Sequence, residues 1–498
     1  MQSPPARYLV FGASGYVGSH LVPFLAERGH AVRAVSRRLD AMEARGWPGA
    51  ELMAADALRP ETLPAALEGV DTAFYLVHSM AAGKDFPALD RTAAAHFRDA
   101  AAQAGVRRIV YLGGLQPKGR SSTHLASRGE TGELLRQGPV PVTELRAGVI
   151  IGPGSAAFEI IRDLVFHLPA MVTPRWVHSR SQPVALADVL EDLLALAQQP
   201  EAAGRTYDTG GPEVLSYKQL MEQFGALVGK RPIIVPLPVL TPRLSSYWLD
   251  LVTAVPANVA RALIDGLEHD VLADDAALRA LVPRRLTPYQ EAAQAAFAAE
   301  RAHWNESEGL APPPGAEPPQ GSGRRWAEGS MLYRQNRADL AYYAKHMSGQ
   351  ADARAPAAAL WRVVEAIGGP NGYYYLDALW AVRAKLDELV GGSGLQRGRR
   401  DPAELHLGDV VDFWRVVSYE RGRRLTLLAE MKMPGSAALT FEVQPQGEQT
   451  SRVVITASFH PAGVKGLVYW HALAPAHAFI FPGLAQAIAR RAEAQPGS

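Results

Sequence analysis

The sequence predicts an α/β fold, with a doubly wound parallel sheet in the N-terminal part and a separate α+β domain in the C-terminal part. Three observations lead to this fold class. A glycine-rich turn joins the first apolar run to an apolar helix. Short apolar runs then alternate with helical patterns over about 300 residues, which is typical of parallel βαβ units. After a segment rich in proline and glycine, apolar side chains recur with period two, which indicates an antiparallel sheet.

The N-terminal part is organised around the stretch Tyr8–Leu21, with the sequence YLVFGASGYVGSHL. Its apolar start is typical of a buried strand, and the chain becomes helical after three glycines. Gly12 permits the tight turn, Gly15 lets the backbone approach a pyrophosphate, and Gly18 lets the helix pack closely on the strand. The N–H groups of the first helical turn would then face the phosphates. The predicted dinucleotide loop consists of Gly12, Ala13, Ser14, Gly15, Tyr16, Val17 and Gly18.

The residues after the second predicted strand, Ala31–Val35, indicate which cofactor is bound. An NAD site usually places a carboxylate there to accept a hydrogen bond from the ribose 2′-hydroxyl, whereas a 2′-phosphate needs cations. This chain has Ser36, Arg37 and Arg38, with no acid before Asp40. Guanidinium groups match phosphate geometry, so we expect NADP(H) in preference to NAD(H). The alternative is a solvated pair of surface arginines.

Further apolar runs predict strands at Glu51–Ala54, Thr72–His78, Arg107–Leu112 and Val142–Ile150, with a helix over Asp90–Ala104. This alternation implies a parallel sheet with helices on both faces and right-handed crossovers. Asp56 follows the third strand, where its carboxylate would accept a hydrogen bond from the adenine edge.

The runs GASGYVG, RRIVYLGG, ELRAGVIIGPGS and QPVALADV together resemble the atypical or extended short-chain dehydrogenase/reductase family, with the NmrA-like and complex-I-accessory-like branches most similar. The resemblance covers about residues 7–300. It implies a Rossmann-type domain with NADP(H) over the strand ends, and a small substrate-facing lobe within about 152–300. By position, Leu76, Val77 and His78 would line the cofactor together with the glycine loop, Ser36–Arg38 and Asp56.

The catalytic part departs from this family. Typical members use a Ser after the fifth strand, and a Tyr followed four residues later by a Lys. Here the fifth strand ends in Gly113-Gly114, and His124-Leu-Ala-Ser-Arg128 occupies the place of Tyr-x-x-x-Lys. The spacing keeps His124 and Arg128 on one helical face. We expect His124 to exchange a proton near neutral pH and Arg128 to anchor the nicotinamide ribose. The alternative is that His124 only begins a helix and the redox site is inactive.

A change of composition marks the clearest domain boundary. From Arg301 to Arg325 the chain is rich in Pro, Gly, Glu and Ala, which predicts a linker with nothing to bury. We therefore expect an NAD(P)-binding domain over residues 1–300, a linker with a connecting helix over 301–352, and a second domain over 353–498.

In the second domain, helices are predicted over Pro356–Ile367 and Leu376–Val390, followed by strands with one buried face. The last apolar stretch, Gly466–Ile488, is interrupted by His471, Pro475, His477 and Pro482. We interpret this stretch as a buried or cavity-covering helix pair, not a membrane span. A curved antiparallel sheet wrapped on a C-terminal helix has helix-grip architecture.

The second domain resembles the uncharacterised DUF2867 family over about residues 353–494. That family looks like a member of the START/polyketide-cyclase-like (SRPBCC) superfamily, which implies a hydrophobic ligand or a lipid-like substrate. The resemblance is carried by YYYLDALWAVRAKLDELVGG, GLQRGRRDPAELHLGDVVDFWRV, LLAEMKMPGSAALTFEV and GLVYWHALAPAHAFIFPGLAQAIA.

Composition excludes several classes of function. The chain has 498 residues, 48% apolar and 20% charged, which is typical of a soluble globular protein, and we expect it in the cytoplasm. A net charge of +1 argues against nucleic-acid binding. The absence of cysteine excludes disulfides, thiolate nucleophiles and iron–sulfur ligation. His471 and His477 are six residues apart, a poor spacing for a shared metal, so we expect no metal site.

Two functional hypotheses follow. The first is an NADP(H)-dependent oxidoreductase that acts on an apolar carbonyl, quinone or enone, with a C-terminal domain that binds a hydrophobic ligand. The second is a non-catalytic NADP(H) sensor, as among NmrA-like proteins, whose redox state controls binding of a lipid-like ligand or a protein partner. The region 113–128 discriminates between them, because the Ser is missing there and the Tyr and Lys are replaced.

Overall fold

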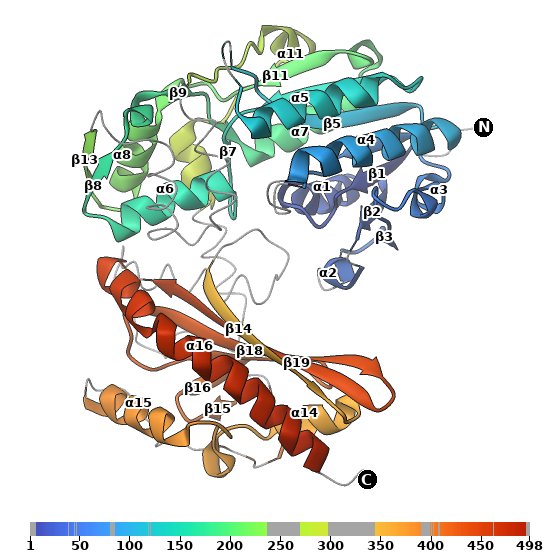
Figure 1. Ribbon diagram of the computed structural model, residues 1–498. Coiled ribbons are helices and arrows are strands. Elements are labelled where there is room, and N and C mark those ends of the chain that lie inside the picture. Colours follow the sequence, from blue (N-terminus) through green and yellow to red (C-terminus); the bar gives the residue numbers. More distant parts are fainter. Residues whose placement is uncertain are drawn as a thin grey trace. The chain divides into compact units, whose positions relative to one another are not determined.

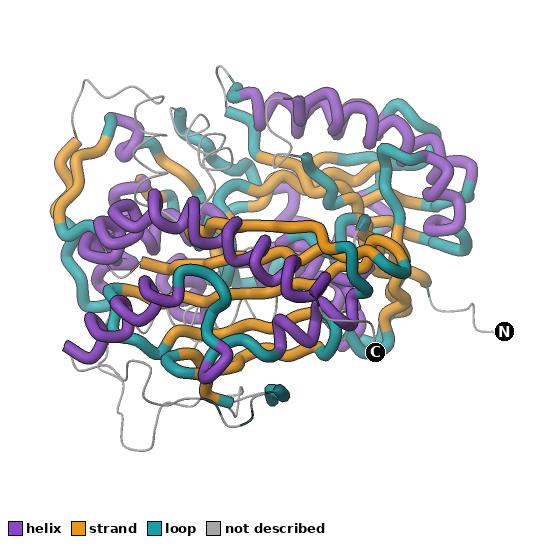
Figure 2. The backbone as a smooth tube through the Cα atoms, turned by 60° about the horizontal axis from the view of Figure 1, so that its bottom comes forward, coloured by secondary structure: helices purple, strands orange, loops and turns teal. Residues whose placement is uncertain are grey.

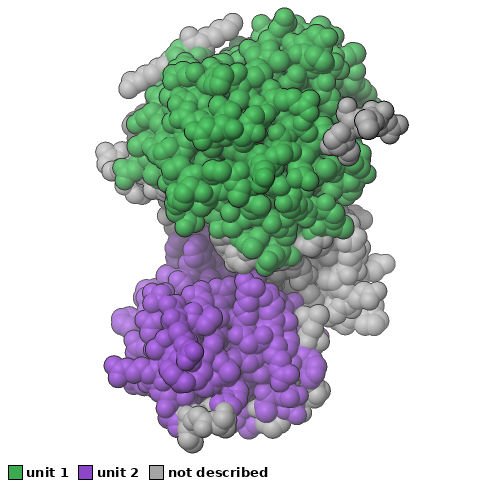
Figure 3. Space-filling model, turned by 90° about the vertical axis from the view of Figure 1, so that its right-hand side faces the viewer, with its two compact units in different colours: residues 1–299, 337–343 green, residues 300–336, 344–498 purple. Residues whose placement is uncertain are grey.

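The computed structural model describes residues 6–236, 269–296, 344–389 and 399–494, except 38, 44, 46, 80–84, 118, 120, 400, 402, 407, 408 and 462. The chain divides into two compact units, coloured in Figure 3: residues 1–299 with 337–343, and residues 300–336 with 344–498. Arg38 and the predicted linker from Arg301 to Arg325 lie outside the described residues.

The first unit contains a seven-stranded parallel sheet with the strand order β11-β6-β5-β4-β1-β2-β3 (Figure 1). The reversal of strand order beside β1 makes the sheet doubly wound, as predicted. Its strands are β1 (Arg7–Phe11), β2 (Ala31–Ser36), β3 (Ala50–Ala54), β4 (Thr72–Tyr75), β5 (Arg108–Gly114), β6 (Val142–Ala147) and β11 (Thr206–Thr209).

Helices cover both faces of this sheet because successive side chains of β1 point to opposite sides. Tyr8 and Val10 pack into one core, with α1 and α7, whereas Leu9 and Phe11 pack into the other, with α3, α4 and α5. The helices are α1 (Tyr16–Glu27), α2 (Leu39–Glu43), α3 (Leu63–Leu67), α4 (Phe86–Gln103), α5 (Thr123–Arg136) and α7 (Leu186–Gln198).

A smaller lobe of the first unit follows β6. Three two-stranded ribbons and several helices build it in the described part of the chain. The ribbons pair β7 (Ile150–Ile151) with β10 (Val184–Ala185), β9 (Arg180–Ser181) with β12 (Leu215–Ser216), and β8 (Ala170–Thr173) with β13 (Ile233–Pro236). The helices α6 (Ala156–His167) and α8 (Tyr217–Leu227) belong to this lobe. Helix α11 (Ala276–Leu281) instead lies beside β11, and its Leu278 joins the core that contains Tyr8 and Val10.

Two predicted strands end earlier in the structure than the sequence pattern indicated. Leu76–His78 is not part of β4: the Leu76 N–H donates to the Phe11 carbonyl at 2.9 Å, and the chain then leaves the sheet. Likewise β6 ends at Ala147, and Ile150 belongs to a separate ribbon with β10. Apolar residues continue past both strand ends because they line the site described below.

The second unit contains a six-stranded antiparallel sheet with the strand order β14-β19-β18-β17-β16-β15. Its strands are β14 (Lys345–Ala353), β15 (Val410–Val411), β16 (Trp414–Glu420), β17 (Arg424–Ala429), β18 (Gly435–Gly447) and β19 (Thr450–Pro461). The helices α14 (Ala357–Glu365), α15 (Asp377–Leu389) and α16 (Gly463–Ala494) lie on one side of it, as Figures 1 and 2 show. This arrangement confirms the predicted helix-grip-like domain.

The predicted C-terminal helix pair is wrong, because residues 463–494 form the single helix α16, with Pro475 and Pro482 inside it. Proline removes one helical hydrogen bond and normally kinks or ends a helix. Here the helix continues because it is held on both sides of the prolines: Trp470 before them and Leu484 after them are buried in the core of the unit. Tertiary packing therefore overrides the local signal.

Gly349 of β14 sets how closely α16 approaches the sheet. A Cβ atom at this position would lie 2.3 Å from the backbone carbon of Phe481, closer than real Cβ atoms approach other atoms. We expect Gly349→Ala to lower the free energy of unfolding of the second unit by about 1–3 kcal/mol, because the helix must shift. Unfolding by denaturant measures this change in the free energy of unfolding. The neighbouring Ser348 is exposed, so Ser348→Ala is the control and should stay within about 0.5 kcal/mol.

Candidate functional site

The glycine loop has the geometry that a dinucleotide pyrophosphate requires. Gly12 has φ +95°, and a Cβ there would lie 3.0 Å from the carbonyl carbon of Leu76. A Cβ on Gly18 would lie 2.4 Å from the Gly12 oxygen, so only glycine allows α1 to pack this closely on β1. Gly15 is the N-cap of α1 and provides no side-chain hydrogen bond. The first-turn N–H groups therefore have no capping side chain, which suits an anionic ligand.

Polar groups from β2 and the α2 region hold the loop in place. Ser14 and Ser36 share a 2.6 Å hydrogen bond between their hydroxyl groups. Arg45 donates to the carbonyls of Ala13 at 3.2 Å and Ser14 at 3.0 Å. Sequence reasoning missed Arg45, since nothing in the local pattern distinguishes it from other surface arginines. Arg37 is exposed in the bend after β2, beside this cluster.

The other predicted cofactor residues lie at the ends of neighbouring strands. Asp56 follows β3 and is half-buried, and its Oδ1 atom accepts from the Leu58 N–H at 3.0 Å. Leu76, Val77 and His78 form the segment after β4, half-buried next to the glycine loop. All of these residues therefore surround the carboxyl ends of β1–β4, where open α/β sheets bind their ligands.

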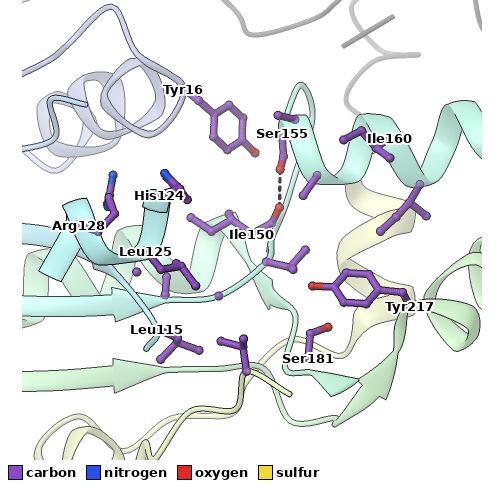
Figure 4. Close-up of a pocket in the computed structure, with 18 of the residues that line it drawn as sticks. Tyr16, Leu115, His124, Leu125, Arg128, Ile150, Ser155, Ile160, Ser181 and Tyr217 are labelled. Carbon is purple, nitrogen blue, oxygen red and sulfur yellow. Dashed lines mark hydrogen bonds between the residues drawn. The ribbon is translucent and has the colours of Figure 1, made fainter. Parts of the chain in front are cut away.

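A cavity of about 340 Å³ opens beside the first turn of α1 and extends into the smaller lobe (Figure 4). It brings together five of the predicted site residues, namely Tyr16, Val17, His78, His124 and Arg128. Most of the rest of its lining is apolar, and it includes Leu115, Leu125, Ile150, Ile160, Ile161, Leu164, Trp176 and Met221. Ser155, Ser181 and Tyr217 add hydroxyl groups on the side of the smaller lobe. The sequence pattern did not single out these lobe residues, because elements far apart in the chain supply them.

The place of the family's Ser is closed in this structure. A Cβ on Gly114 would lie 3.0 Å from Leu125 Cδ2, and one on Gly113 would lie 2.5 Å from Glu144 Oε1. Neither glycine can be replaced by a serine without displacing its neighbours. Ser122 is the N-cap of α5, and its hydroxyl accepts from the Leu125 N–H at 3.3 Å.

His124 belongs to a buried row of three titratable side chains. Its ring centroid lies 4.9 Å from that of His78, and His78 Nδ1 lies 3.6 Å from Asp90 Oδ2. Asp90 also accepts from the Ser79 N–H at 2.8 Å and from the Ser127 hydroxyl at 3.0 Å. Sequence reasoning missed Asp90, because a carboxylate on α4 carries no local sign that it faces α5.

The surroundings keep both imidazoles neutral. Burial, together with the neighbouring His78 and the Arg128 guanidinium, lowers the pKa of His124 to about 3. Burial also lowers the pKa of His78. Burial opposes ionisation of Asp90, but contact with His78 and the Ser79 N–H outweighs it and lowers the pKa of that carboxyl. At neutral pH, His124 is therefore a neutral hydrogen-bonding group, whereas the sequence led us to expect ready exchange of a proton.

Arg128 is fixed next to His124 on α5. Its guanidinium donates to the Leu112 carbonyl and lies 5.6 Å from the centre of the Tyr111 ring. Tyr111 in turn donates from its hydroxyl to the Arg128 carbonyl at 2.8 Å. These contacts hold a positive charge at the end of β5, where the predicted ribose contact would form. Within the described ranges, no group of three or more His, Asp or Glu side chains could hold a metal ion.

The comparisons with known proteins agree with this architecture. Residues 12–136 match the family model described as NAD(P)H-binding, and residues 337–484 match the one described as protein of unknown function (DUF2867). Among curated proteins, a 3β-hydroxysteroid dehydrogenase/Δ5→4-isomerase of Mycobacterium tuberculosis is 38% identical over 69 residues, or 14% of this chain. The match spans only 18% of the length of that relative.

Solved structures with the same fold cover the first unit. An NADPH-dependent quinone oxidoreductase of Escherichia coli, complexed with NADPH, is 18% identical, with a TM-score of 0.50, over 58% of this chain and 99% of its own. A short-chain dehydrogenase/reductase superfamily protein of Agrobacterium tumefaciens with bound NAD is 18% identical, with a TM-score of 0.46, over 61% and 99% of the two chains. At this identity the likeness shows the fold and nothing further.

The low pKa of His124 predicts a specific pH dependence of stability. In the folded protein His124 stays neutral down to about pH 3. In the unfolded chain the same imidazole has its ordinary pKa of 6.5 and binds a proton below that pH. Lowering the pH from 7.5 to 5 therefore favours the unfolded state, by about 2 kcal/mol from this group. We expect His124→Gln to remove that part of the pH dependence. Calorimetry at several pH values measures this pH dependence. The unfolding transition of the first unit is identified as the one that added NADPH shifts. Equal pH dependence in the two proteins would contradict the assignment.

Proposed function

On the premise that residues 12–136 form an NAD(P)H-binding domain and residues 337–484 a DUF2867 domain, we propose that the chain is an NADP(H)-dependent oxidoreductase. Its proposed hydride acceptor is an apolar carbonyl, quinone or enone. The cavity carries this proposal, because it connects the first turn of α1 to His124 and Arg128 through a largely apolar lining. An acceptor in the cavity would face both the cofactor loop and these two side chains.

The glycine loop supports the presence of the cofactor, since only glycine fits at Gly12 and Gly18 and the helix N-terminus is uncapped. The bound dinucleotide supplies the hydride. The proposed preference for NADP(H) rests on Arg37 and Arg38 after β2, and on the lack of a carboxylate between Ser36 and Asp40. In this site Arg45 orders the loop carbonyls, and Arg128 holds a positive charge at the end of β5.

Because His124 is neutral, some hydride acceptors fit this proposal better than others. A neutral imidazole donates a hydrogen bond to a developing oxyanion but does not hand over a proton as an imidazolium does. Quinones and enones give delocalised oxyanions after hydride addition, which need less help from an acid than a simple alkoxide does. We therefore rank quinones and enones above isolated carbonyls. The His78 ring lies beside His124, with 4.9 Å between the ring centroids, and Asp90 lies behind His78.

The second candidate function is the non-catalytic NADP(H) sensor. The closed serine position at Gly113-Gly114 and the low pKa of His124 favour it specifically, because both remove the proton chemistry that reductases of this fold family typically use. The same loop and cavity would then bind cofactor and ligand without hydride transfer.

The role of the second unit and the cellular location are also proposals. Binding of a hydrophobic ligand is supported by the helix-grip-like architecture of residues 344–494, although Trp470, Phe481 and Leu484 of α16 fill the space against the sheet. A cytoplasmic location is supported by the ordinary globular composition. Binding of nucleic acid is not proposed, because the net charge is only +1.

Cofactor preference is testable with paired variants. We expect Arg37→Ala combined with Arg38→Ala to weaken NADPH binding by about 10-fold or more, with little effect on NADH, because only the 2′-phosphate loses its partners. Arg45→Ala is the matched comparison, and it should weaken both cofactors alike because it releases the loop carbonyls. Isothermal titration measures all four affinities. Equal loss of NADPH and NADH binding in the Arg37/Arg38 variant would show that the phosphate is bound elsewhere.

Hydride transfer is testable in a single turnover. The protein loaded with NADPH is mixed with quinones, enones and aldehydes of similar size, and oxidation of NADPH is followed by absorbance. We expect His124→Ala to slow oxidation by about 10²–10³-fold, the typical effect of one lost oxyanion donor. His178→Ala is the control, because His178 is an exposed histidine of the same unit. Since His124 stays neutral, the rate should show no titration of this group between about pH 6 and 8.

Two results would decide against this mechanism. A rate that falls through a pKa near 6.5 and loses that titration in His124→Ala would mean that His124 acts as an ordinary imidazolium acid. Tight NADPH binding with no oxidation by any acceptor would favour the sensor.

A further inference from the structure

The smaller lobe supplies the cavity with polar groups that the proposed hydride transfer does not use. Ser181 of β9 and Tyr217 at the start of α8 line the cavity on the side opposite His124 and Arg128 (Figure 4). Trp176 lines it as well. Most of the remaining lining is apolar. The cavity therefore has polar side chains at each end and an apolar wall between them.

Backbone pairing brings the Ser181 and Tyr217 hydroxyl groups together. Ser181 pairs with Leu215 across the ribbon of β9 and β12, and Tyr217 follows two residues after Leu215. The Tyr217 N–H donates to the Ser179 carbonyl at 3.3 Å, which fixes the start of α8 against the end of β9. Ser216, the N-cap of α8, forms a complete capping box. The position of the Tyr217 side chain is therefore set by regular structure on both sides of it.

The Tyr217 hydroxyl stays protonated and can donate a hydrogen bond. Burial raises the pKa of Tyr217 above its ordinary value, and contact with the Ser181 hydroxyl opposes this shift without cancelling it. The Tyr217 ring meets the Trp176 ring edge-on, with 6.0 Å between the ring centroids. A phenol and a serine hydroxyl each donate one hydrogen bond and accept others. Together they form a neutral pair that can bind an oxygen atom of a ligand.

Trp176 adds a buried donor to the same end of the cavity. Its side chain is only 7% exposed, and its Nε1 atom has no hydrogen-bond partner within the described part of the chain. Native proteins pair nearly all buried polar groups, so a ligand or a water molecule is expected to accept from this N–H. No described residue of the smaller lobe that lines the cavity is charged. The group bound here is therefore a neutral oxygen, since a carboxylate or a phosphate would need a cation.

We infer that Trp176, Ser181 and Tyr217 form a distal oxygen site, which binds a neutral carbonyl or hydroxyl oxygen at the far end of the acceptor. The inference rests on the proposed function for one point, that the other oxygen of the acceptor lies near His124. An apolar ring with oxygens on opposite sides, as in a para-quinone, satisfies both ends of the cavity. An enone or aldehyde with a single oxygen leaves the distal donors unpaired, which weakens its binding. The cavity therefore selects para-quinones over enones.

Binding is tested without hydride transfer, on the full chain loaded with NADP⁺. The two probes share one bicyclic ring system: 1-tetralone has one oxygen, and 4-hydroxy-1-tetralone has a second oxygen on the opposite side of the ring. We expect 4-hydroxy-1-tetralone to bind about 10-fold more tightly in isothermal titration. Tyr217→Phe combined with Ser181→Ala should remove most of this difference, and Trp176→Phe should reduce it. Met221→Leu is the matched control, because it changes an apolar lining residue of the same helix and should leave the ratio of the two affinities unchanged.

Equal affinities of the unaltered chain for the two tetralones overturn the inference, because water would then satisfy the distal groups. Failure of both probes to bind overturns it as well, and so does a ratio that the Tyr217/Ser181 variant leaves unchanged. Thermal unfolding with and without NADPH verifies that each variant is folded.

Single-turnover oxidation of NADPH separates this inference from the proposed function. Oxidation by quinones together with equal tetralone affinities would leave the oxidoreductase in place and remove the distal oxygen site. The expected tetralone ratio, with no oxidation of NADPH by any acceptor, would confirm the distal oxygen site as a ligand site of a protein that transfers no hydride.

Discussion

The close approach of α1 to the turn after β1 is the constraint on which the first unit depends. Gly18 has no side chain, and a Cβ atom there would lie only 2.4 Å from the Gly12 oxygen, so only glycine lets the helix start this close to the turn. That contact aims the uncapped end of α1 at the strand ends, and it carries Tyr16 and Val17 into the cavity wall. One steric condition therefore positions both the expected phosphate site and part of the acceptor site.

Burial then determines what the remaining site residues can do. His124 sits at the place of a tyrosine, and an isolated imidazole there would titrate near neutral pH. Surrounded by apolar lining, His78 and Arg128, it stays neutral instead. Asp90 stays ionised behind His78, so the row runs from a fixed negative charge to the cavity. The arrangement favours hydrogen bonding to an oxyanion over transfer of a proton.

The second unit has a dense core but leaves several apolar side chains exposed. Its sheet and α16 form a dense core in which Gly349 lets the helix touch strand β14. Some apolar side chains of this unit remain exposed, among them Val382 of α15 and Phe479 of α16.

The sequence by itself determined the doubly wound sheet, the glycine loop, the antiparallel second domain and both family resemblances, because these depend on local periodicity and on glycines at turns. Only the tertiary structure decided that Pro475 and Pro482 lie inside one helix, since packing at Trp470 and Leu484 outweighs the local break. It alone brought Asp90 and Arg45 to the site and lowered the pKa of His124, because contacts between distant elements and burial leave no local pattern.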